Sequence, residues 1–462
     1  MLKLDLTVQE MLDILETAPV GVPARTLKRK VNLCLDSREK AKGVVFWPIK
    51  GARFDAHKFV SQMEKDGALM SVVNQESVEQ NAIKMYAPVD DTTKALLKLA
   101  KGYQRLFKLK KVAITGSNGK TTTKEMTKAV LSMKFNTHAT QGNFNNHIGV
   151  PMTLFQLKHS HEAAVVEMGT SGPDEIRPLS LATEPDIAVI TNIGASHLER
   201  LGDLDGVFNE KINIVAGLKK GGTLIVNADD ERLCKVKATK NYKVVTFGVR
   251  RGILKPEKLK WTENLCADFY IGRTHFVLNV PGDHNLYDAL AAIAVGEALR
   301  IPKSDIAKAL AGFTSTSMRM EIKAANGFKV ISDCYNANPS STKMALQTLG
   351  NMRVEGKRIA VLGDMLELGK ESGNLHKQIG TLVPEMNFDV LLAVGKEAKK
   401  YVEGAKSRGM KNVQYFETVP EVISHLSETV AEGDILLVKG SRGMHMEQVV
   451  DALLHMVPVF KI

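Results

Sequence analysis

The chain has 462 residues, of which 44% are hydrophobic and 24% charged, and its formal net charge is +11. This length is too great for one hydrophobic core and predicts about three domains of ordinary globular composition. No apolar run is long enough to span a bilayer, the N-terminus lacks the apolar core of a secretory signal, and the four cysteines have neither zinc nor disulfide spacing, so we expect a cytoplasmic protein.

The first hundred residues contain short apolar runs, such as residues 44–47 and 68–73, separated by polar turns. They predict a small α/β domain. A lysine-rich helix is expected over residues 93–109, and it leads into the most informative segment of the chain.

That segment is a glycine-rich turn that follows an apolar run and ends in Lys120 and Thr121. Gly116 and Gly119 allow the backbone N–H groups to turn inward and cradle phosphate oxygens at the N-terminus of the next helix. Lys120 would reach the β- and γ-phosphates, and the Thr121 hydroxyl would ligate Mg²⁺. Ile114 stands where the standard P-loop has another glycine. A chance strand–turn–helix corner is the alternative, but the agreement of strand, loop and helix favours a phosphate-binding loop.

From about residue 111 to residue 315 the order strand, loop, helix repeats. Three apolar runs have the length of buried parallel strands: residues 164–167, 187–191 and 222–226. Chemistry in such sheets gathers at the carboxyl ends of the strands, which singles out Glu167, Asn192 and His197. Glu167 is predicted to ligate Mg²⁺, with a surface glutamate as the alternative. His197 is predicted to be a site residue, against a structural histidine.

Two further segments of this region have more than one interpretation. Lys211 falls in a helix expected over residues 205–218, and composition alone favours a solvated helix lysine. Residues 281–290 open an alanine-rich helix, and the polar residues there either cap the helix or read a base edge.

After about residue 316 the alternation of strands and helices starts again without a second phosphate loop. Four runs are strand candidates: residues 330–332, 358–362, 390–394 and 435–438. They predict a Rossmann-like domain that completes a site. The turn at residues 333–340 is rich in donors and acceptors, although a plain Asn-Pro turn is equally favoured. The loop at residues 439–442 is either an anion site or a solvated basic turn.

Together these segments resemble the Mur ligase family, whose members build the peptide stem of peptidoglycan. The phosphate loop is shared with folylpolyglutamate synthase and so identifies only the superfamily. Other segments resemble the family member that adds a dipeptide: residues 333–340 (DCYNANPS), 363–369 with His376 downstream, 438–442 (VKGSR), 142–151, and 36–38 with 51–59.

The resemblance implies an α/β fold with three domains: a UDP-sugar-binding α/β domain at residues 1–100, a central parallel-sheet P-loop ATPase domain at 101–315 and a C-terminal Rossmann-like domain at 316–462. It also implies an ATP-dependent amide ligase that joins D-alanyl-D-alanine to UDP-N-acetylmuramoyl-tripeptide through an acyl phosphate. A Mur ligase that adds a single amino acid and folylpolyglutamate synthase are the alternatives, and residues 333–340 argue against both.

Two alternatives come from other classes. A non-catalytic nucleotide-binding scaffold would be expected to lose some of the following residues, and all are present: Lys120, Thr121, Glu167, His197 and Lys211. A nucleic-acid-binding protein is disfavoured because the basic residues are spread along the chain without interleaved aromatics. We expect a monomer without nucleic-acid partners and without a membrane span.

The resemblance also implies roles for individual residues. The catalytic residues are Lys120, His197 and Lys211. The ATP-binding residues are Gly116, Ser117, Asn118, Gly119, Lys120, Thr121, Thr122, His284, Asn285, Arg319, Asp333 and Asn336. The Mg²⁺ ligands are Thr121, Glu167, His197 and Lys211, with Lys211 carbamylated so that an ammonium becomes an anionic ligand. The substrate-binding residues are Ser37, Arg38, Asn146, Asn336, Asn338 and Ser340.

The chain departs from the family pattern at two positions. Asp288 stands where the helix after His284 usually carries an asparagine; an ionised aspartate accepts hydrogen bonds but cannot donate them, which puts nucleotide contacts there in doubt. Ala56 stands where a glycine is common before His57, so the local backbone is expected to differ there.

Overall fold

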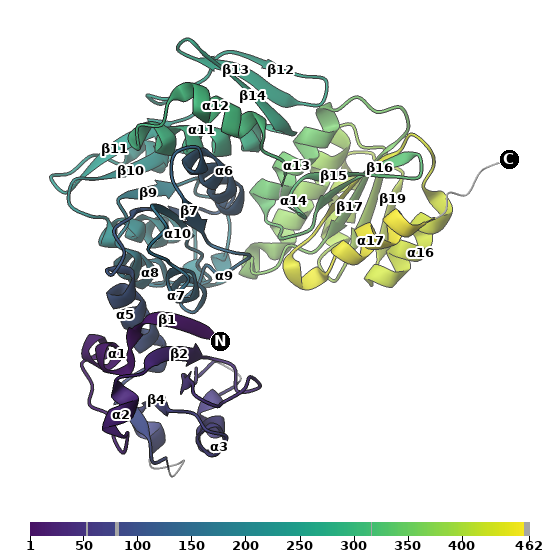
Figure 1. Cartoon of the computed structure of the whole chain (residues 1–462). Coiled ribbons are helices and arrows are strands. Elements are labelled where there is room, and N and C mark those ends of the chain that lie inside the picture. The colour runs from purple at the N-terminus through teal and green to yellow at the C-terminus, as the bar shows by residue number, and fades with distance from the viewer. Residues whose placement is uncertain (52–53, 79–82, 316, 457–462) are drawn as a thin grey trace.

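The computed structural model describes residues 1–51, 54–78, 83–315 and 317–456. The N-terminal domain lies at one end of the molecule, the central domain lies next to it, and the C-terminal domain packs against the side of the central domain (Figure 1). The three-domain α/β architecture predicted from the sequence is confirmed. Across the described ranges, no helix has the length and apolar character needed to cross a membrane.

The N-terminal domain is built on a five-stranded sheet in the order β1-β2-β3-β4-β5. Its strands are β1 (Leu2–Thr7), β2 (Lys30–Cys34), β3 (Val45–Phe46), β4 (Met70–Asn74) and β5 (Tyr86–Val89). Its helices include α1 (Val8–Leu15), α2 (Ala24–Leu27) and α3 (Val60–Lys65). Strand β1 is antiparallel to β2 and the other pairs are parallel. The runs predicted at residues 44–47 and 68–73 form β3 and β4.

Helix α5 (Thr92–Gln104) joins the N-terminal and central domains. It packs against α1 on one side and against helices α7 (Gly149–Leu154) and α8 (Ile176–Thr183) on the other. One continuous apolar core therefore includes Leu6 of β1, Leu99 of α5 and Val150 of α7. The predicted domain boundary at residue 100 falls inside this helix.

The central domain contains a six-stranded, entirely parallel sheet in the order β11-β10-β9-β6-β8-β7. The strands are β6 (Lys110–Thr115), β7 (Thr137–Ala139), β8 (Ala163–Glu167), β9 (Ile187–Ile190), β10 (Gly222–Asn227) and β11 (Tyr242–Phe247). The remaining helices of the domain are α6 (Lys120–Ser132), α9 (Leu198–Leu201), α10 (Leu204–Ile212), α11 (Asp283–Ala298) and α12 (Lys303–Ala311).

Both faces of this sheet are buried, as the continuous apolar runs predicted. Along β6, Val112 and Ile114 belong to a core shared with α6 and α11, whereas Ala113 faces the core that contains α8. The three strands predicted in the central region are confirmed. The helix predicted over residues 205–218 is shorter than expected, because α10 ends at Ile212 and residues Asn213–Gly217 form a 3₁₀ turn.

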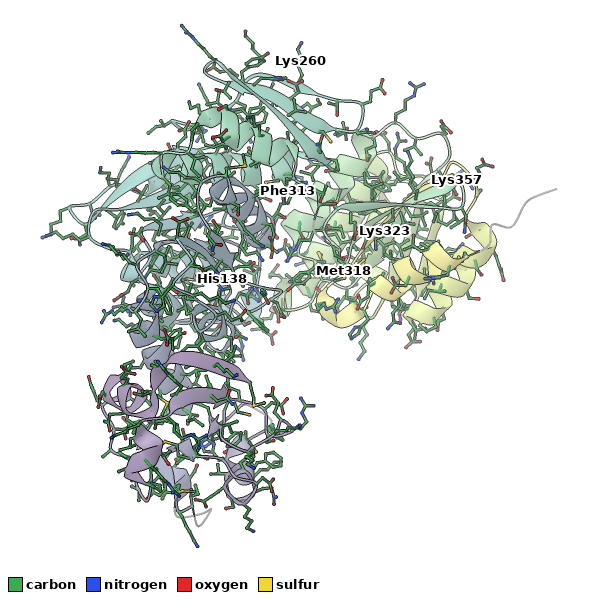
Figure 2. All side chains as sticks on the ribbon, viewed as in Figure 1. His138, Lys260, Phe313, Met318, Lys323 and Lys357 are labelled. Carbon is green, nitrogen blue, oxygen red and sulfur yellow. The ribbon has the colours of Figure 1, made fainter. Side chains whose placement is uncertain are left out.

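A separate three-stranded antiparallel sheet, which the sequence analysis did not predict, covers the far side of α11 and α12. It consists of β12 (Glu257–Trp261), β13 (Cys266–Ile271) and β14 (Thr274–Pro281). Phe269, Phe276 and Leu278 point inward from β13 and β14, and Lys260 of β12 projects away from the molecule (Figure 2). Strand β14 leads directly into α11 and so fixes where that helix begins.

The C-terminal domain has a six-stranded sheet in the order β15-β16-β20-β17-β18-β19, parallel except for β15. The strands are β15 (Glu321–Ala325), β16 (Phe328–Asp333), β17 (Arg358–Gly363), β18 (Val390–Val394), β19 (Val413–Phe416) and β20 (Ile435–Lys439). The helices are α13 (Pro339–Asn351), α14 (Ser372–Glu385), α15 (Lys399–Ser407), α16 (Val419–Thr429) and α17 (Glu447–His455). All four predicted strands are present. Phe313 and Met318 lie where this domain joins the central one (Figure 2).

Candidate active site

The glycine-rich turn forms a tight loop between β6 and α6, as predicted. Gly116 has φ 153° and Gly119 has φ 78°, and a Cβ atom on Gly116 would lie 1.8 Å from the Thr191 hydroxyl oxygen. The end of β9 holds the loop from below: the Asn118 N–H donates to Asn192 Oδ1 (2.9 Å) and the Thr191 hydroxyl donates to the Asn118 carbonyl (2.5 Å). Only glycine fits at Gly116, and the loop is fixed before any ligand binds.

Lys120, the first residue of α6, folds back over the loop. Its Nζ donates to the carbonyl oxygens of Gly116 (2.7 Å) and Ser117 (3.2 Å). Burial lowers the pKa of Lys120 to about 8, against the opposing effect of Glu167 and with a smaller contribution from Arg319 in the same direction. An anion beside Nζ would offset the cost of burying this charge, as a phosphate group does at such a loop.

Glu167 and Thr121 place two oxygen-bearing side chains next to each other beside the loop. Glu167 ends β8 and is 2% exposed; its Oε2 accepts from the Thr121 hydroxyl (3.0 Å) and its Oε1 from Asn145 Nδ2 (2.9 Å). Arg319 Nη2 donates to the same Thr121 oxygen (2.9 Å). One carboxylate and one hydroxyl beside a phosphate loop suit Mg²⁺, which usually takes few protein ligands and completes its shell with water and phosphate. In the part of the chain that the structure describes, no group of three or more His, Cys, Asp and Glu residues could hold a metal.

The C-terminal domain contributes the turn that follows β16. Lys439 at the end of β20 is 2% exposed, and its Nζ donates to Asp333 Oδ2 (2.6 Å) and to the Asn336 carbonyl (2.9 Å). Lys439 therefore holds this turn in place and is not an open cation. Asn338 caps α13 by accepting from the Ser341 N–H (2.9 Å). The Asn-Pro turn is thus both a helix start and part of the pocket wall.

The two domains touch directly at the phosphate loop. The Asn118 side chain donates to Ser340 Oγ (2.7 Å) and accepts from Asn338 Nδ2 (2.7 Å). A second contact joins His197 Nδ1 to Glu367 Oε2 (2.5 Å), and the hydrogen bond from His197 lowers the pKa of Glu367. His197 has φ 54° and precedes the short helix α9. These contacts join the central and C-terminal domains directly.

The space between these two domains is a pocket of about 660 Å³. Most of the predicted site residues line it: Ser117, Asn118, Gly119, Lys120, Thr121, Thr122, Asn146, Glu167, His197, His284, Asn285, Arg319, Asp333, Asn336, Asn338 and Ser340. Gly116, Lys211, Ser37 and Arg38 are not part of its wall. The pocket joins residues that lie more than 300 positions apart in the chain, and both domains are needed to form it.

Lys211 is buried, so a solvated helix lysine is the wrong interpretation. Its side chain is 2% exposed, and its Nζ makes no hydrogen bond or ion pair within the described parts of the chain. Burial first and the charge of Lys120 second push the pKa of Lys211 well below its usual range, with Glu210 acting in the opposite direction. Burial and the charge of Lys120 therefore favour the unprotonated amine, which is the form that reacts with CO₂.

Ser37 and Arg38 lie in the N-terminal domain, in the loop after β2 and apart from the pocket. Arg38 is exposed and pairs with Asp36 (2.6 Å). His57 is buried: its Nδ1 lies 2.6 Å from Asp55 Oδ1, and its Nε2 accepts from the Asn74 N–H (3.1 Å). Ala56 starts a 3₁₀ turn without a positive φ, so glycine is not required there.

Some pocket residues were not predicted. Asn227 and Phe247 end β10 and β11, and Tyr335 lies under the Arg319 guanidinium (4.0 Å from Cζ to the ring centroid). The rule that chemistry gathers at the carboxyl ends of parallel strands applies to Phe247 as well. Phe247 was not predicted as a site residue because residues 242–247 were not identified as a strand.

Comparisons with known proteins show to which family the chain belongs. Residues 114–296 match the Mur ligase middle domain, and residues 318–442 match the family described as Mur ligase, glutamate ligase domain. The UDP-N-acetylmuramoyl-tripeptide–D-alanyl-D-alanine ligase of Bacillus subtilis is 38% identical over 92% of this chain and 93% of its own length. A crystal structure of MurF from Acinetobacter baumannii superposes with a TM-score of 0.87 at 30% identity, covering 98% and 99% of the two chains.

A third relative carries a nucleotide. The MurF ligase from Thermotoga maritima, solved in complex with ADP, has a TM-score of 0.79 at 27% identity and covers 92% of this chain and 97% of its own. The fold and the pocket define an ATP-using ligase built from a phosphate-loop domain and a Rossmann-like domain. The chain belongs to the Mur ligase family, and the UDP-N-acetylmuramoyl-tripeptide–D-alanyl-D-alanine ligase of Escherichia coli is a further relative, 35% identical over 90% of this chain and 92% of its own length.

Proposed function

We propose that the protein joins D-alanyl-D-alanine to UDP-N-acetylmuramoyl-tripeptide at the expense of ATP, in the synthesis of peptidoglycan precursors. The observation that carries this proposal is the single pocket in which the loop of Lys120 meets the turn of Asn336 and Asn338. A nucleotide triphosphate on the loop would face a surface rich in amide groups supplied by the other domain. Such a surface suits a peptide substrate, because it offers both donors and acceptors.

The chemistry follows from the weakness of a carboxylate as an electrophile. ATP phosphorylates the terminal carboxylate of the tripeptide, the dipeptide amine attacks the acyl carbon, and the tetrahedral intermediate releases phosphate. Lys120 and the loop N–H groups stabilise the charge that shifts during phosphoryl transfer. Arg319, in contact with Thr121, brings a second cation from the C-terminal domain.

We propose that Thr121 and Glu167 hold Mg²⁺, which would neutralise charge on the phosphate oxygens. His197 and Lys211 are proposed as further ligands, Lys211 in its carbamylated form. The burial of Lys211, which lowers its pKa, supports the modification, because CO₂ forms a bond with an unprotonated nitrogen and that nitrogen releases a proton. The carbamate then carries the negative charge that a metal ligand needs.

The finer organisation is also a proposal. We place the domains at residues 1–100, 101–315 and 316–462, and we place the UDP moiety near Ser37 and Arg38 in the first of them. A monomeric, cytoplasmic enzyme is consistent with a reaction that draws on ATP. Gly116 acts through the shape of the loop, since it allows the backbone to approach the phosphates.

The test is release of phosphate from ATP in the presence of UDP-N-acetylmuramoyl-tripeptide, with D-alanyl-D-alanine compared against single amino acids. We expect release only with the dipeptide, together with a product whose mass has increased by one dipeptide residue. The control is Lys120→Ala, which should remain folded and lose ligation.

Each contrary result has a distinct meaning. Release with a single amino acid would assign the chain to another step of the same pathway. Release with folate and glutamate would favour the folylpolyglutamate synthase alternative. No release with any acceptor, or full activity in Lys120→Ala, would refute the proposed use of the loop.

A further inference from the structure

Asp288, one of the two departures from the family pattern, lies against the phosphate loop. It is on the second turn of α11, 4% exposed, and lines the pocket. A Cβ atom on Gly119 would lie 2.2 Å from Asp288 Oδ1 and 3.2 Å from Oδ2, so the whole carboxyl group packs against the last glycine of the loop. Asp288 Oδ1 accepts from the Thr123 hydroxyl (2.9 Å).

The other carboxyl oxygen has no partner. Asp288 Oδ2 is buried and makes no hydrogen bond in the described part of the chain. Burying an ionised carboxylate that has one oxygen without a hydrogen bond costs free energy. Burying a protonated carboxyl group costs less, because that group carries no charge. The geometry therefore favours the acid form at a place where phosphates are to bind.

We propose that Asp288 binds a proton when nucleotide binds the loop, so that it acts as a neutral, asparagine-like positioning residue under the phosphates. The proton comes from solvent and returns to it when the nucleotide leaves. This inference rests on the proposed use of ATP, but it adds a linkage that the proposed reaction does not require.

The environment of Asp288 favours protonation of its carboxyl group. Burial raises the pKa of Asp288 to about 7, and the Thr123 hydrogen bond and Arg319 act in the opposite direction without cancelling the effect. On the same helix, burial lowers the pKa of His284, which favours the neutral form of that ring. Tyr287 donates to Asp229 (2.8 Å), so the Asp229 carboxylate is satisfied elsewhere.

The sign of the linkage follows directly. In the free protein the carboxyl group loses its proton as the pH rises through about 7. The negative phosphates raise the pKa of Asp288 further, so binding takes up a proton between the free and bound pKa values. Nucleotide affinity should therefore fall above pH 7, by up to tenfold per pH unit while the linkage lasts.

The experiment measures the Kd of Mg-ADP by calorimetry from pH 6 to pH 8.5, in pairs of buffers with different ionisation enthalpies, for the full-length protein and for Asp288→Asn. Using the ratio of the two Kd values cancels the ionisation of the nucleotide itself. We expect equal affinities at pH 6, at least a fivefold advantage for Asp288→Asn at pH 8.5, and proton uptake in the parent that the variant lacks.

A second variant tests the inference independently, in case Asp288→Asn does not fold. Thr123→Val removes the hydrogen bond that stabilises the ionised carboxylate, so the pH at which affinity begins to fall should move upward. A Kd ratio that does not change with pH, or proton uptake that is the same in parent and Asp288→Asn, would overturn the inference while leaving ATP binding intact. No Mg-ADP binding at any pH would overturn the proposed function as well.

Discussion

Glu210 offers a stability prediction whose size can be worked out atom by atom. It is 3% exposed and precedes Lys211 on α10, and its carboxylate accepts three backbone N–H groups at the start of α8. Oε1 accepts from Glu175 (3.0 Å) and Ile176 (2.7 Å), and Oε2 accepts from Asp174 (2.7 Å). Asp174 has φ 61°, an unfavourable backbone conformation that this carboxylate holds in place.

Two substitutions separate the contributions that the individual hydrogen bonds of Glu210 make to stability. Glu210→Gln keeps the Oε1 acceptor and loses only the bond to Asp174, an exposed residue whose N–H water can reach, so the loss should be about 1 kcal/mol. Glu210→Ala also removes the acceptor for the N–H of Ile176, a residue that is 0% exposed. This variant should lose roughly 3–5 kcal/mol of the free energy of unfolding. At about 2–4 °C per kcal/mol for a domain of 150–250 residues, the melting temperature should fall by a few degrees for Gln and by about 6–20 °C for Ala.

The assay is thermal unfolding of the full-length protein, followed by far-UV circular dichroism and calorimetry at neutral pH. Retained ligation by Glu210→Gln at low temperature would show that α10 still presents Lys211 correctly. Equal melting temperatures for Gln and Ala would refute the reasoning, because Glu210→Gln keeps the acceptor for the N–H groups of Glu175 and Ile176 and should therefore be the more stable variant.

Two further predictions concern the pocket. Lys211→Ala should abolish ligation, and added short carboxylic acids should partly restore it by supplying the missing anion; full activity without rescue would mean that the buried amine has no role in the reaction. Asn118→Ala should weaken the contact between the domains by roughly 1–3 kcal/mol, since it removes two hydrogen bonds worth about 0.5–1.5 kcal/mol each. Its radius of gyration by X-ray scattering should exceed that of the parent, with Ser340→Ala between the two; an unchanged value for Asn118→Ala would contradict this.

The parts of the fold that the sequence revealed are those in which a local pattern and its structural cause coincide. The strand before Gly116 is apolar on both faces because the parallel sheet is covered on both sides, and this leaves a continuous run that is easy to recognise. The same holds for β8 and β9, which end in Glu167 and Ile190. By contrast, β12–β14 have one exposed face, and their alternation is interrupted by register shifts. Those strands were not found.

The pocket was predicted less completely than the fold, because much of it depends on which side chains meet across domains. The sequence marks Lys439 as a cation in a donor-rich loop, and only the packing shows that Asp333 and the Asn336 carbonyl bind it. Likewise, the sequence of the helix alone predicts that Lys211 is a surface lysine. Its burial comes from the elements packed around α10, which no local pattern encodes. Its site role came from the family resemblance alone.

The arrangement of the two lysines explains why one modification would suit this site. Burial first and the charge of Lys120 second lower the pKa of Lys211, which favours the unprotonated amine that reacts with CO₂. Once a carbamate has formed, the same positive charge attracts it, so Lys120 disfavours the ammonium and favours the carbamate by one electrostatic effect. Burial strengthens both electrostatic effects, because little water screens the interaction between Lys120 and Lys211. A buried lysine whose pKa is lowered by a neighbouring cation is therefore better prepared for carbamylation than an exposed lysine, and the proposed carbamate ligand would be stabilised by the charge of Lys120.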